Sequence, residues 1–421
     1  MRGACAGEPF YRELEDKRYC VFHFPGKEKS ADFEQALQRK LENKDFNFRG
    51  VWFPNKLSFE RFEFGTKADF SSANFSAETD FRAATFSAAA DFHSATFSAV
   101  AVFSGATFSA AADFIGATFS GAAYFFSSAT FSAAAYFRAA TFSAEAYFSP
   151  ATFSATADFR YATFSAEASF SSATLADHVR FAGEEKTEVF TDTSRLDLQF
   201  ARIEKPDRVS FHTLSLRPHW FVNIDARKFG FTNVDWGRPS INEEISRLEK
   251  KKISSPHHLL AIACRNLAVN AEENHRYEEA SRLRYRAMEA RRRESWRGFA
   301  PWRLNWWYWL ASGYGERVWQ AFFVLLGILL LSALLYNQVG FARWEPKLAS
   351  EGDVVISKRD DIGAPLKFSR ALTYSAAVMT FQKPEPRPAT TAAQTVVLLE
   401  TILGPVQAAL LALAIRRKFM R

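Results

Sequence analysis

Phenylalanine recurs along the first half of the chain at a spacing that fits neither a helix nor a long strand. The steps alternate between five and six residues from Phe48 to Phe119 and, after one extra residue at Phe125–Phe126, again from Phe131 to Phe170, with Leu175 and Phe181 completing the run. Such steps would spread the rings around the whole circumference of a helix and leave no apolar stripe. The pattern therefore predicts a solenoid of short sides with inward-pointing phenylalanines.

Small residues accompany the aromatic ones. Two positions before nearly every phenylalanine stands an alanine, such as Ala84, Ala90 or Ala95, and the position between is Thr in one register and Asp, Tyr or Val in the other. We expect alanine to pack beside each ring in a narrow interior, with coils stacked at the ~4.8 Å separation of neighbouring strands. The 11-residue unit, as in ATFSAAADFHS, predicts about 22 residues per coil and about six regular coils.

This repeat resembles the pentapeptide-repeat family, whose unit is A-(D/N)-(L/F)-x-x. The resemblance implies a right-handed quadrilateral β-helix over residues 45–181, followed by irregular final coils over 182–236; the alternation of five and six departs from the family pattern. Some members of the family mimic DNA through a strongly acidic surface. Residues 66–181 contain nine Asp and Glu against five Lys and Arg, so nucleic acid is not an expected partner.

The N-terminal segment, residues 1–44, is predicted to cap the first coil through an amphipathic helix over 31–44. It also contains Cys5, Cys20 and His23, the last two at C-x-x-H spacing. A structural zinc site needs four ligands and only three are found, so buried thiols and a packed histidine are the alternative. Three cysteines in 421 residues fit a reducing compartment, and no apolar leader precedes the repeat, so we expect the repeat on the cytoplasmic side.

A basic segment, 237–317, follows the coils. Its 255–294 portion has helical spacing of apolar residues, with a turn expected at Asn274 and His275, and so predicts a helical hairpin. The string at 277–280 resembles the middle of a tetratricopeptide repeat. We interpret the hairpin as a coupling element between the coils and a membrane.

Two stretches near the C-terminus predict membrane spans. Residues 318–336 are nineteen residues without a charge, which is long enough for a hydrocarbon core of about 30 Å, and a second span is expected over 395–415. Tryptophans and tyrosines crowd before the first span, and arginines lie before it and after the second. The positive-inside rule then places both termini in the cytoplasm of a bacterial inner-membrane protein.

The segment between the spans predicts a short apolar helix over 368–382 followed by KPEPRP. Residues 318–418 resemble the two-span pore module of the bacterial potassium-channel-like family, which implies that the short helix is re-entrant and that a pore would be a tetramer. The resemblance makes Thr380, Phe381, Gln382 and Lys383 the filter-equivalent residues and Gly404 and Pro405 a hinge. The strip has no glycine to let carbonyls line an ion path, so potassium selectivity is not expected.

Glu400 and Gln407 are polar residues inside the second predicted span. An ionisable group within a membrane is costly, so it usually faces a cavity or a partner. Either a water-filled cavity or a hydrogen bond to a neighbouring helix would explain Glu400.

Two functions remain open from the sequence. One is a gated pore formed by a homo-oligomer, with an ion as its substrate; the other is a non-conducting scaffold anchored in the lipid bilayer that offers the β-helix to a cytoplasmic protein partner. The chain has no P-loop, nucleophile elbow or dinucleotide fingerprint, so neither an enzyme nor a cofactor is expected.

Overall fold

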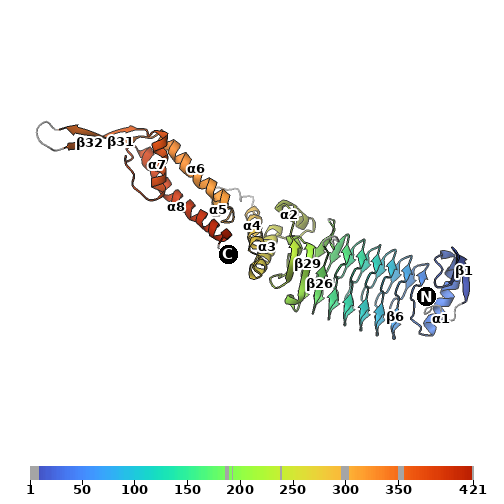
Figure 1. Cartoon of the computed structure of the whole chain (residues 1–421). Coiled ribbons are helices and arrows are strands. Elements are labelled where there is room, and N and C mark those ends of the chain that lie inside the picture. Colours follow the sequence, from blue (N-terminus) through green and yellow to red (C-terminus); the bar gives the residue numbers. More distant parts are fainter. Residues whose placement is uncertain are drawn as a thin grey trace. The chain divides into compact units, whose positions relative to one another are not determined.

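The chain forms two compact units, one ending at Asn274 and the other beginning at His275. The computed structural model, drawn in Figure 1, describes residues 9–184, 189–191, 193–237, 239–294, 303–348 and 355–419. Each unit has its own core.

The first unit is a β-solenoid of about eight turns, which confirms the fold predicted from the phenylalanine spacing. Its strands are mostly two residues long and form four parallel sheets of eight, six, seven and seven strands. The right hand and the quadrilateral section of the coil stay predictions.

Each sheet takes one strand from each turn. The eight-stranded sheet contains β6 (Ala68–Asp69), β10 (Ala90–Asp91), β14 (Ala112–Asp113), β18 (Ala135–Tyr136), β22 (Ala157–Asp158), β26 (Val179–Ala182), β29 (Val209–Ser215) and β30 (Gly230–Asp235). The six-stranded sheet contains β3 (Trp52–Phe53), β7 (Asn74–Phe75), β11 (Thr96–Phe97), β15 (Thr118–Phe119), β19 (Thr141–Phe142) and β23 (Thr163–Phe164). One seven-stranded sheet contains β4 (Leu57–Ser58), β8 (Thr79–Asp80), β12 (Ala101–Val102), β16 (Ala123–Tyr124), β20 (Ala146–Tyr147), β24 (Glu167–Ser169) and β27 (Arg195–Asp197). The other contains β5 (Glu63–Phe64), β9 (Thr85–Phe86), β13 (Thr107–Phe108), β17 (Thr130–Phe131), β21 (Thr152–Phe153), β25 (Thr174–Leu175) and β28 (Arg202–Ile203).

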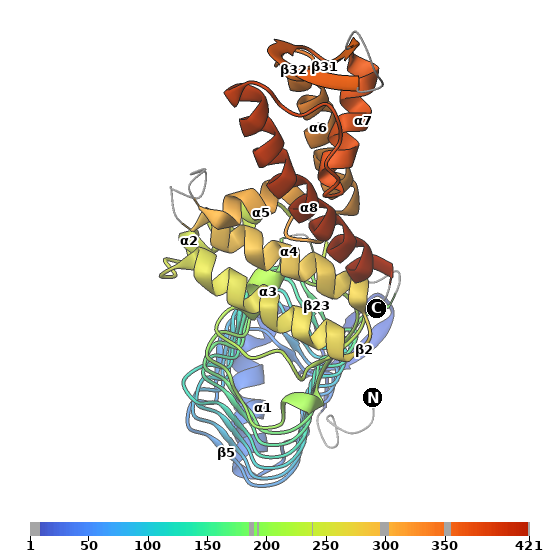
Figure 2. The ribbon, with the colours of Figure 1, turned by 90° about the vertical axis from the view of Figure 1, so that its left-hand side faces the viewer.

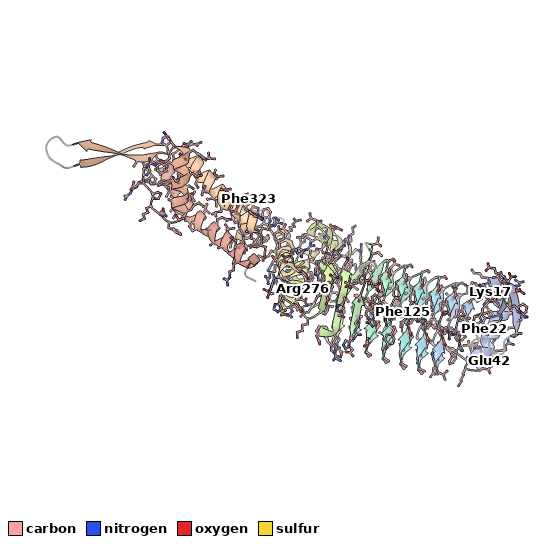
Figure 3. All side chains as sticks on the ribbon, viewed as in Figure 1. Lys17, Phe22, Glu42, Phe125, Arg276 and Phe323 are labelled. Atoms are coloured by element: carbon pink, nitrogen blue, oxygen red, sulfur yellow. The ribbon has the colours of Figure 1, made fainter. Side chains whose placement is uncertain are left out.

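Strand register confirms the coil length. Partners lie 22 residues apart, as in Ala68 with Ala90, and 23 apart where a coil contains the extra residue, as in Thr107 with Thr130. The extra residue is accommodated at Phe126, whose ring is 38% exposed, while the preceding Phe125 stays inside the coil (Figure 3).

The interior is a stack of aromatic rings. Successive coils place ring over ring, as with Phe86 and Phe108, whose centroids are 4.8 Å apart and whose planes differ by 1°. Rings from different sheets meet edge to face, as with Phe92 and Phe103 at 5.6 Å and 87°. Buried alanines fill the remaining space beside the rings, as the sequence predicted.

A tight turn recurs in every five-residue step. Ala73 donates its N–H to the carbonyl of Phe70 at 3.0 Å, and Ser72, the third of the four residues in this turn, has φ of 57°. A positive φ at the third position of a turn is the requirement of a type II turn. Equivalent left-handed residues follow at 11-residue intervals, among them Ala83, Ser94, Gly105 and Gly116.

The N-terminal cap contains the predicted helix, α1 (Ser30–Glu42), together with a hairpin of β1 (Phe10–Leu14) and β2 (Lys17–Cys20) and the short helix η1 (Lys27–Lys29). Phe33 of α1 closes the first coil by an edge-to-face contact with Phe53 at 5.5 Å. Lys29 is fully buried, donates to the carbonyl of Phe22 at 2.9 Å and lies over the ring of Phe33.

The other end of the solenoid is covered by helices. The last turns contain η2 (Pro206–Arg208) and η3 (Pro218–Phe221), and α2 (Ile241–Lys250) and α3 (Pro256–Glu273) pack on η3. Figure 2 shows α2 and α3 in yellow across this end of the coils. Asn270 of α3 donates to the carbonyls of Phe229 at 2.7 Å and Arg227 at 2.9 Å, so it supplies hydrogen-bond donors to the backbone of the final turn.

The second unit is mainly helical. It contains α4 (Tyr277–Arg293), α5 (Leu304–Ser312), α6 (Val318–Tyr336), α7 (Phe368–Met379) and α8 (Thr391–Phe419), and a hairpin of β31 (Phe341–Leu348) and β32 (Val355–Ala364). The expected turn at Asn274 and His275 lies between α3 and α4. Two of the described helices, α6 and residues 391–417 of α8, are long and apolar enough to cross a membrane. The hairpin was not predicted.

Candidate functional site

A buried polar cluster joins the helices α6, α7 and α8 of the second unit. Glu400 on α8, 2% exposed, accepts hydrogen bonds from the hydroxyl of Tyr336 on α6 at 2.5 Å and from the hydroxyl of Ser375 on α7. Ser375 also lies 3.1 Å from the carbonyl of Leu329 on α6. Glu400 therefore hydrogen-bonds to two neighbouring helices, which is the second of the two explanations that the sequence left open.

An aromatic core packs beside this cluster. Tyr336, Phe341 and Tyr374 meet edge to face with centroids 5.0 to 5.5 Å apart, and Ala333, Ala371 and Ala393 let the helix backbones approach. A buried carboxylate is tolerated only where donors surround it. The cluster thus fixes the mutual positions of α6, α7 and α8.

Gln407 makes a second polar link about two turns further along α8, since its side-chain amide donates to the carbonyls of Ala311 on α5 at 2.7 Å and Ala321 on α6 at 2.8 Å. Gly404 lies between the two links, and a Cβ there would come within 2.8 Å of the Met379 side chain on α7. Pro405 lies inside α8, which continues through it. Gly404 therefore has a packing role, and the hinge remains a prediction.

The filter-equivalent strip begins at the C-terminus of α7. The Thr380 hydroxyl donates to the carbonyl of Ala377 at 3.0 Å, and the N–H of Gln382 donates to the same carbonyl at 2.9 Å. Phe381 between them has φ of 60° and is 69% exposed, and Lys383 is exposed. Within one chain these four residues form a helix cap and an exposed loop, and the described contacts assign them no ion path.

A third cluster lies at the opposite ends of the spanning helices and was not anticipated. Glu316, just before α6, accepts from Arg417 of α8 at 3.3 Å and from the hydroxyl of Ser281 on α4. Arg417 also donates to the carbonyl of Tyr314 at 3.0 Å. This cluster ties the basic helix α4 to both spanning helices. The one feature of the sequence that could have indicated this cluster is Glu316, an acidic residue in a segment rich in arginine.

The N-terminal cysteine and histidine do not assemble a zinc site in the described residues. His23 Nδ1 lies 3.2 Å from Cys20 Sγ, and its Nε2 lies 3.0 Å from the carbonyl of Arg49. Burial lowers the pKa of His23, although the Arg49 carbonyl opposes this shift. Cys5 lies outside the described residues, among which no group of three metal ligands occurs.

Sheet order, strand register and the stacked core define the first unit as a parallel β-solenoid. Residues 84–128 and 126–174 match the family described as pentapeptide repeats (9 copies), as the resemblance implied. No curated protein and no solved structure matches the chain.

Proposed function

We propose that the chain is an inner-membrane protein in which α6 and α8 span the bilayer and the pentapeptide-repeat solenoid lies in the cytoplasm. One observation carries this proposal: α6 and α8 expose large apolar side chains and bury the polar side chains of Glu400 and Gln407. Large side chains such as Trp319, Phe323 and Leu331 on α6 and Leu398 and Ile402 on α8 are mostly exposed, with Phe323 labelled in Figure 3, whereas Glu400 and Gln407 are buried. Contiguous apolar surface of this kind marks contact with lipid or with another chain.

A charge on the lipid-facing side tests the membrane location. Leu331→Arg puts a guanidinium at an exposed position four residues from the centre of α6, and at the centre such a charge costs about 2.5–3.5 kcal/mol on insertion. We expect this variant to leave the carbonate-resistant membrane fraction, whereas Leu331→Met stays in it. A wild-type chain found in the soluble fraction, or a Leu331→Arg variant that pellets as wild type does, would contradict the proposal.

If α6 and α8 span the bilayer, we further propose that the second unit forms a homo-oligomeric, pore-like module. Its support is the order of a spanning helix, a short helix and a second spanning helix, with α7 held to both neighbours through Ser375. Two spans cannot enclose a pore, so conduction needs several copies, four by the channel resemblance. The solenoid would then be the regulatory part, and its partner is a cytoplasmic protein.

The second candidate is a non-conducting scaffold, and a specific observation favours it. Between residues 396 and 414 every exposed position of α8 is apolar, so a pore lined by that face would offer no polar group to an ion. The strip Thr380–Lys383 also lacks the glycines of known filters.

Oligomeric mass in detergent and ion flux in liposomes separate the two. A pore predicts an oligomer and a flux whose cation preference rises in Lys383→Glu, because the positive side chain at the mouth is replaced by a negative one. Lys17→Glu, an equal charge change in the N-terminal hairpin, is the control. A monomer without flux would leave only the scaffold.

A further inference from the structure

A cavity lies at the C-terminal end of the solenoid, wholly within the first unit. Its wide basin, about 870 Å³, is formed by β24, β27 and the segment that joins α2 to α3. A narrow recess of about 20 Å³ shares Asp197, Gln199 and Lys251 with the basin and reaches η3. That volume holds about one water molecule or one ligand oxygen atom.

The recess contains buried nitrogen atoms in need of a partner. Trp220 and His219 of η3 line it and are only 6% and 7% exposed. Among the described residues, neither the indole Nε1 of Trp220 nor the imidazole Nε2 of His219 has a hydrogen-bond partner. An unsatisfied buried donor costs about 1–3 kcal/mol, and the indole N–H can only donate. The indole N–H of Trp220 therefore favours an occupant with an acceptor atom, whereas His219, whose Nδ1 lies 3.3 Å from Glu244 Oε1, adds no such requirement.

The charges around the cavity are unevenly paired. Lys251 lies 2.9 Å from both Glu167 and Asp197; burial opposes its charge, but these bonds outweigh burial and raise its pKa. Arg195 in the recess and Lys252 in the basin have no ion-pair partner among the described residues. Among the groups that line the cavity, and with Arg247 paired to Glu243, the two carboxylates stand against Lys251, Arg195 and Lys252, which leaves one positive charge in excess.

The basin also receives the N-terminus of a long helix. Ser254 and Ser255 line it, and α3 begins at Pro256 with no capping hydrogen bond from the Ser255 side chain. The N-terminal end of a helix favours anions, because amide N–H groups and the helix dipole point outward there. This field has the same sign as the unpaired cations.

We propose that this cavity binds a small molecule carrying an oxyanion, a phosphate or a carboxylate, one oxygen of which enters the recess and accepts from Trp220. Arg195 and Lys252 balance its charge. Phe200, 67% exposed on the wall of the basin, gives its carbon skeleton an apolar contact. The inference is independent of the membrane function, because all of these residues belong to the first unit.

Thermal unfolding of the full chain in detergent tests the proposal, with sodium phosphate and sodium malonate compared with sodium chloride at equal ionic strength. A ligand that binds only the folded state raises the melting temperature with its concentration. We expect a saturable rise with phosphate or malonate, and the two arms distinguish the anion classes. If neither salt exceeds chloride, a water molecule fills the recess and the proposal is wrong.

Variants locate the effect. Trp220→Phe keeps the ring but removes the donor, and Arg195→Gln removes the recess charge; each should raise the half-saturating anion concentration at least tenfold. Arg202→Gln is the matched control, because Arg202 begins β28 on another sheet and its side chain is 77% exposed. If Trp220→Phe does not fold, Lys252→Gln, a substitution at an exposed position of the basin, replaces it and should also weaken anion binding. Wild-type affinity in the cavity variants, or an equal loss in Arg202→Gln, would overturn the proposal.

Discussion

At the scale of single residues, the solenoid accepts a backbone cost in each five-residue step. The turn has a positive φ in all of these steps except the one with Pro150 at this position, yet most of the positions hold Ser, Ala, Arg or Tyr and only a few hold glycine. A non-glycine residue in the left-handed region costs about 1–2 kcal/mol. Neighbouring coils provide a direct comparison, because Ala83 and Gly105 occupy the same turn 22 residues apart with φ of 52° and 67°.

Exchanging these two residue types should change stability in opposite directions. Ala83→Gly relieves the left-handed strain but loses chain entropy, so we expect the free energy of unfolding to rise by about 1 kcal/mol. Gly105→Ala should lower it by a similar amount. Urea unfolding followed by circular dichroism measures both, and a loss of stability in Ala83→Gly would show that the turn imposes no strain.

Lys29 is the residue with the clearest pH signature. Burial lowers its pKa to about 7. Between that value and the ordinary lysine pKa of about 10.4, the unfolded chain binds a proton that the folded chain lacks. The contribution of Lys29 to stability is therefore least favourable below pH 7 and improves as the pH rises through this window.

Lys29→Met should remove this dependence. We expect the first unit of the variant to be more stable than wild type at pH 6, and the difference to shrink toward pH 9. Melting curves at several pH values test this, with Lys17→Met in the exposed hairpin as control. A difference that is constant with pH would mean that Lys29 keeps an ordinary pKa in the fold.

At the scale of elements, each side of a regular coil contributes one inward ring, in the strand or directly after it, and the rings above and below determine how much that ring stabilises the coil. Phe131 stacks between Phe108 and Phe153, both at 4.8 Å, whereas in the next coil Phe153 is followed by Leu175 at the equivalent position. The sheet therefore already tolerates leucine once.

Substitution of Phe131 should separate ring loss from cavity formation. Phe131→Ala should cost about 3–5 kcal/mol, because it removes the ring and leaves a void in the stack. Phe131→Leu should cost clearly less, following the natural example of Leu175. Chemical denaturation of the two variants measures the difference. Equal losses would indicate that ring stacking, and not filled volume, holds the coil.

Elements differ in how well the sequence predicts them. The coils were predictable because phenylalanines at alternating steps of five and six residues fit a solenoid and not a helix. The helix α6 was predictable because nineteen consecutive residues carry no charge. The β31–β32 hairpin was missed because the loop reads as polar. Left-handed residues such as Ala83 carry no sequence signal. The partners Tyr336 and Glu400 are 64 residues apart, so the sequence gives no indication that they meet.

At the scale of the whole molecule, the two units have opposite surface chemistry. The solenoid buries most of its phenylalanines and exposes polar side chains such as Lys67 and Arg82, whereas α6 and α8 expose many of their large apolar side chains. The cavity beneath α2 and α3 and the Tyr336–Glu400–Ser375 cluster were not predictable, because each needs residues from three or more elements that only the folded chain brings together.

Cysteine labelling tests the proposed orientation of the whole chain. Lys383→Cys, in the exposed loop between the spans, should react with a membrane-impermeant maleimide on intact cells, whereas Lys17→Cys should react only after permeabilisation. The labelling of wild type gives the background from its own cysteines. Reaction of Lys17→Cys in intact cells would place the solenoid outside.

The register of the coils has a consequence for how such a chain can change in length. Because inward and outward positions repeat with every full coil, duplication or deletion of the coding sequence for one coil keeps every side chain on its own face. Each such event would move the N-terminal cap by ~4.8 Å along the coil axis and leave the helical cover of the last turn untouched. The solenoid can therefore serve as an adjustable spacer, with a reach that recombination between its near-identical repeats can reset in fixed steps.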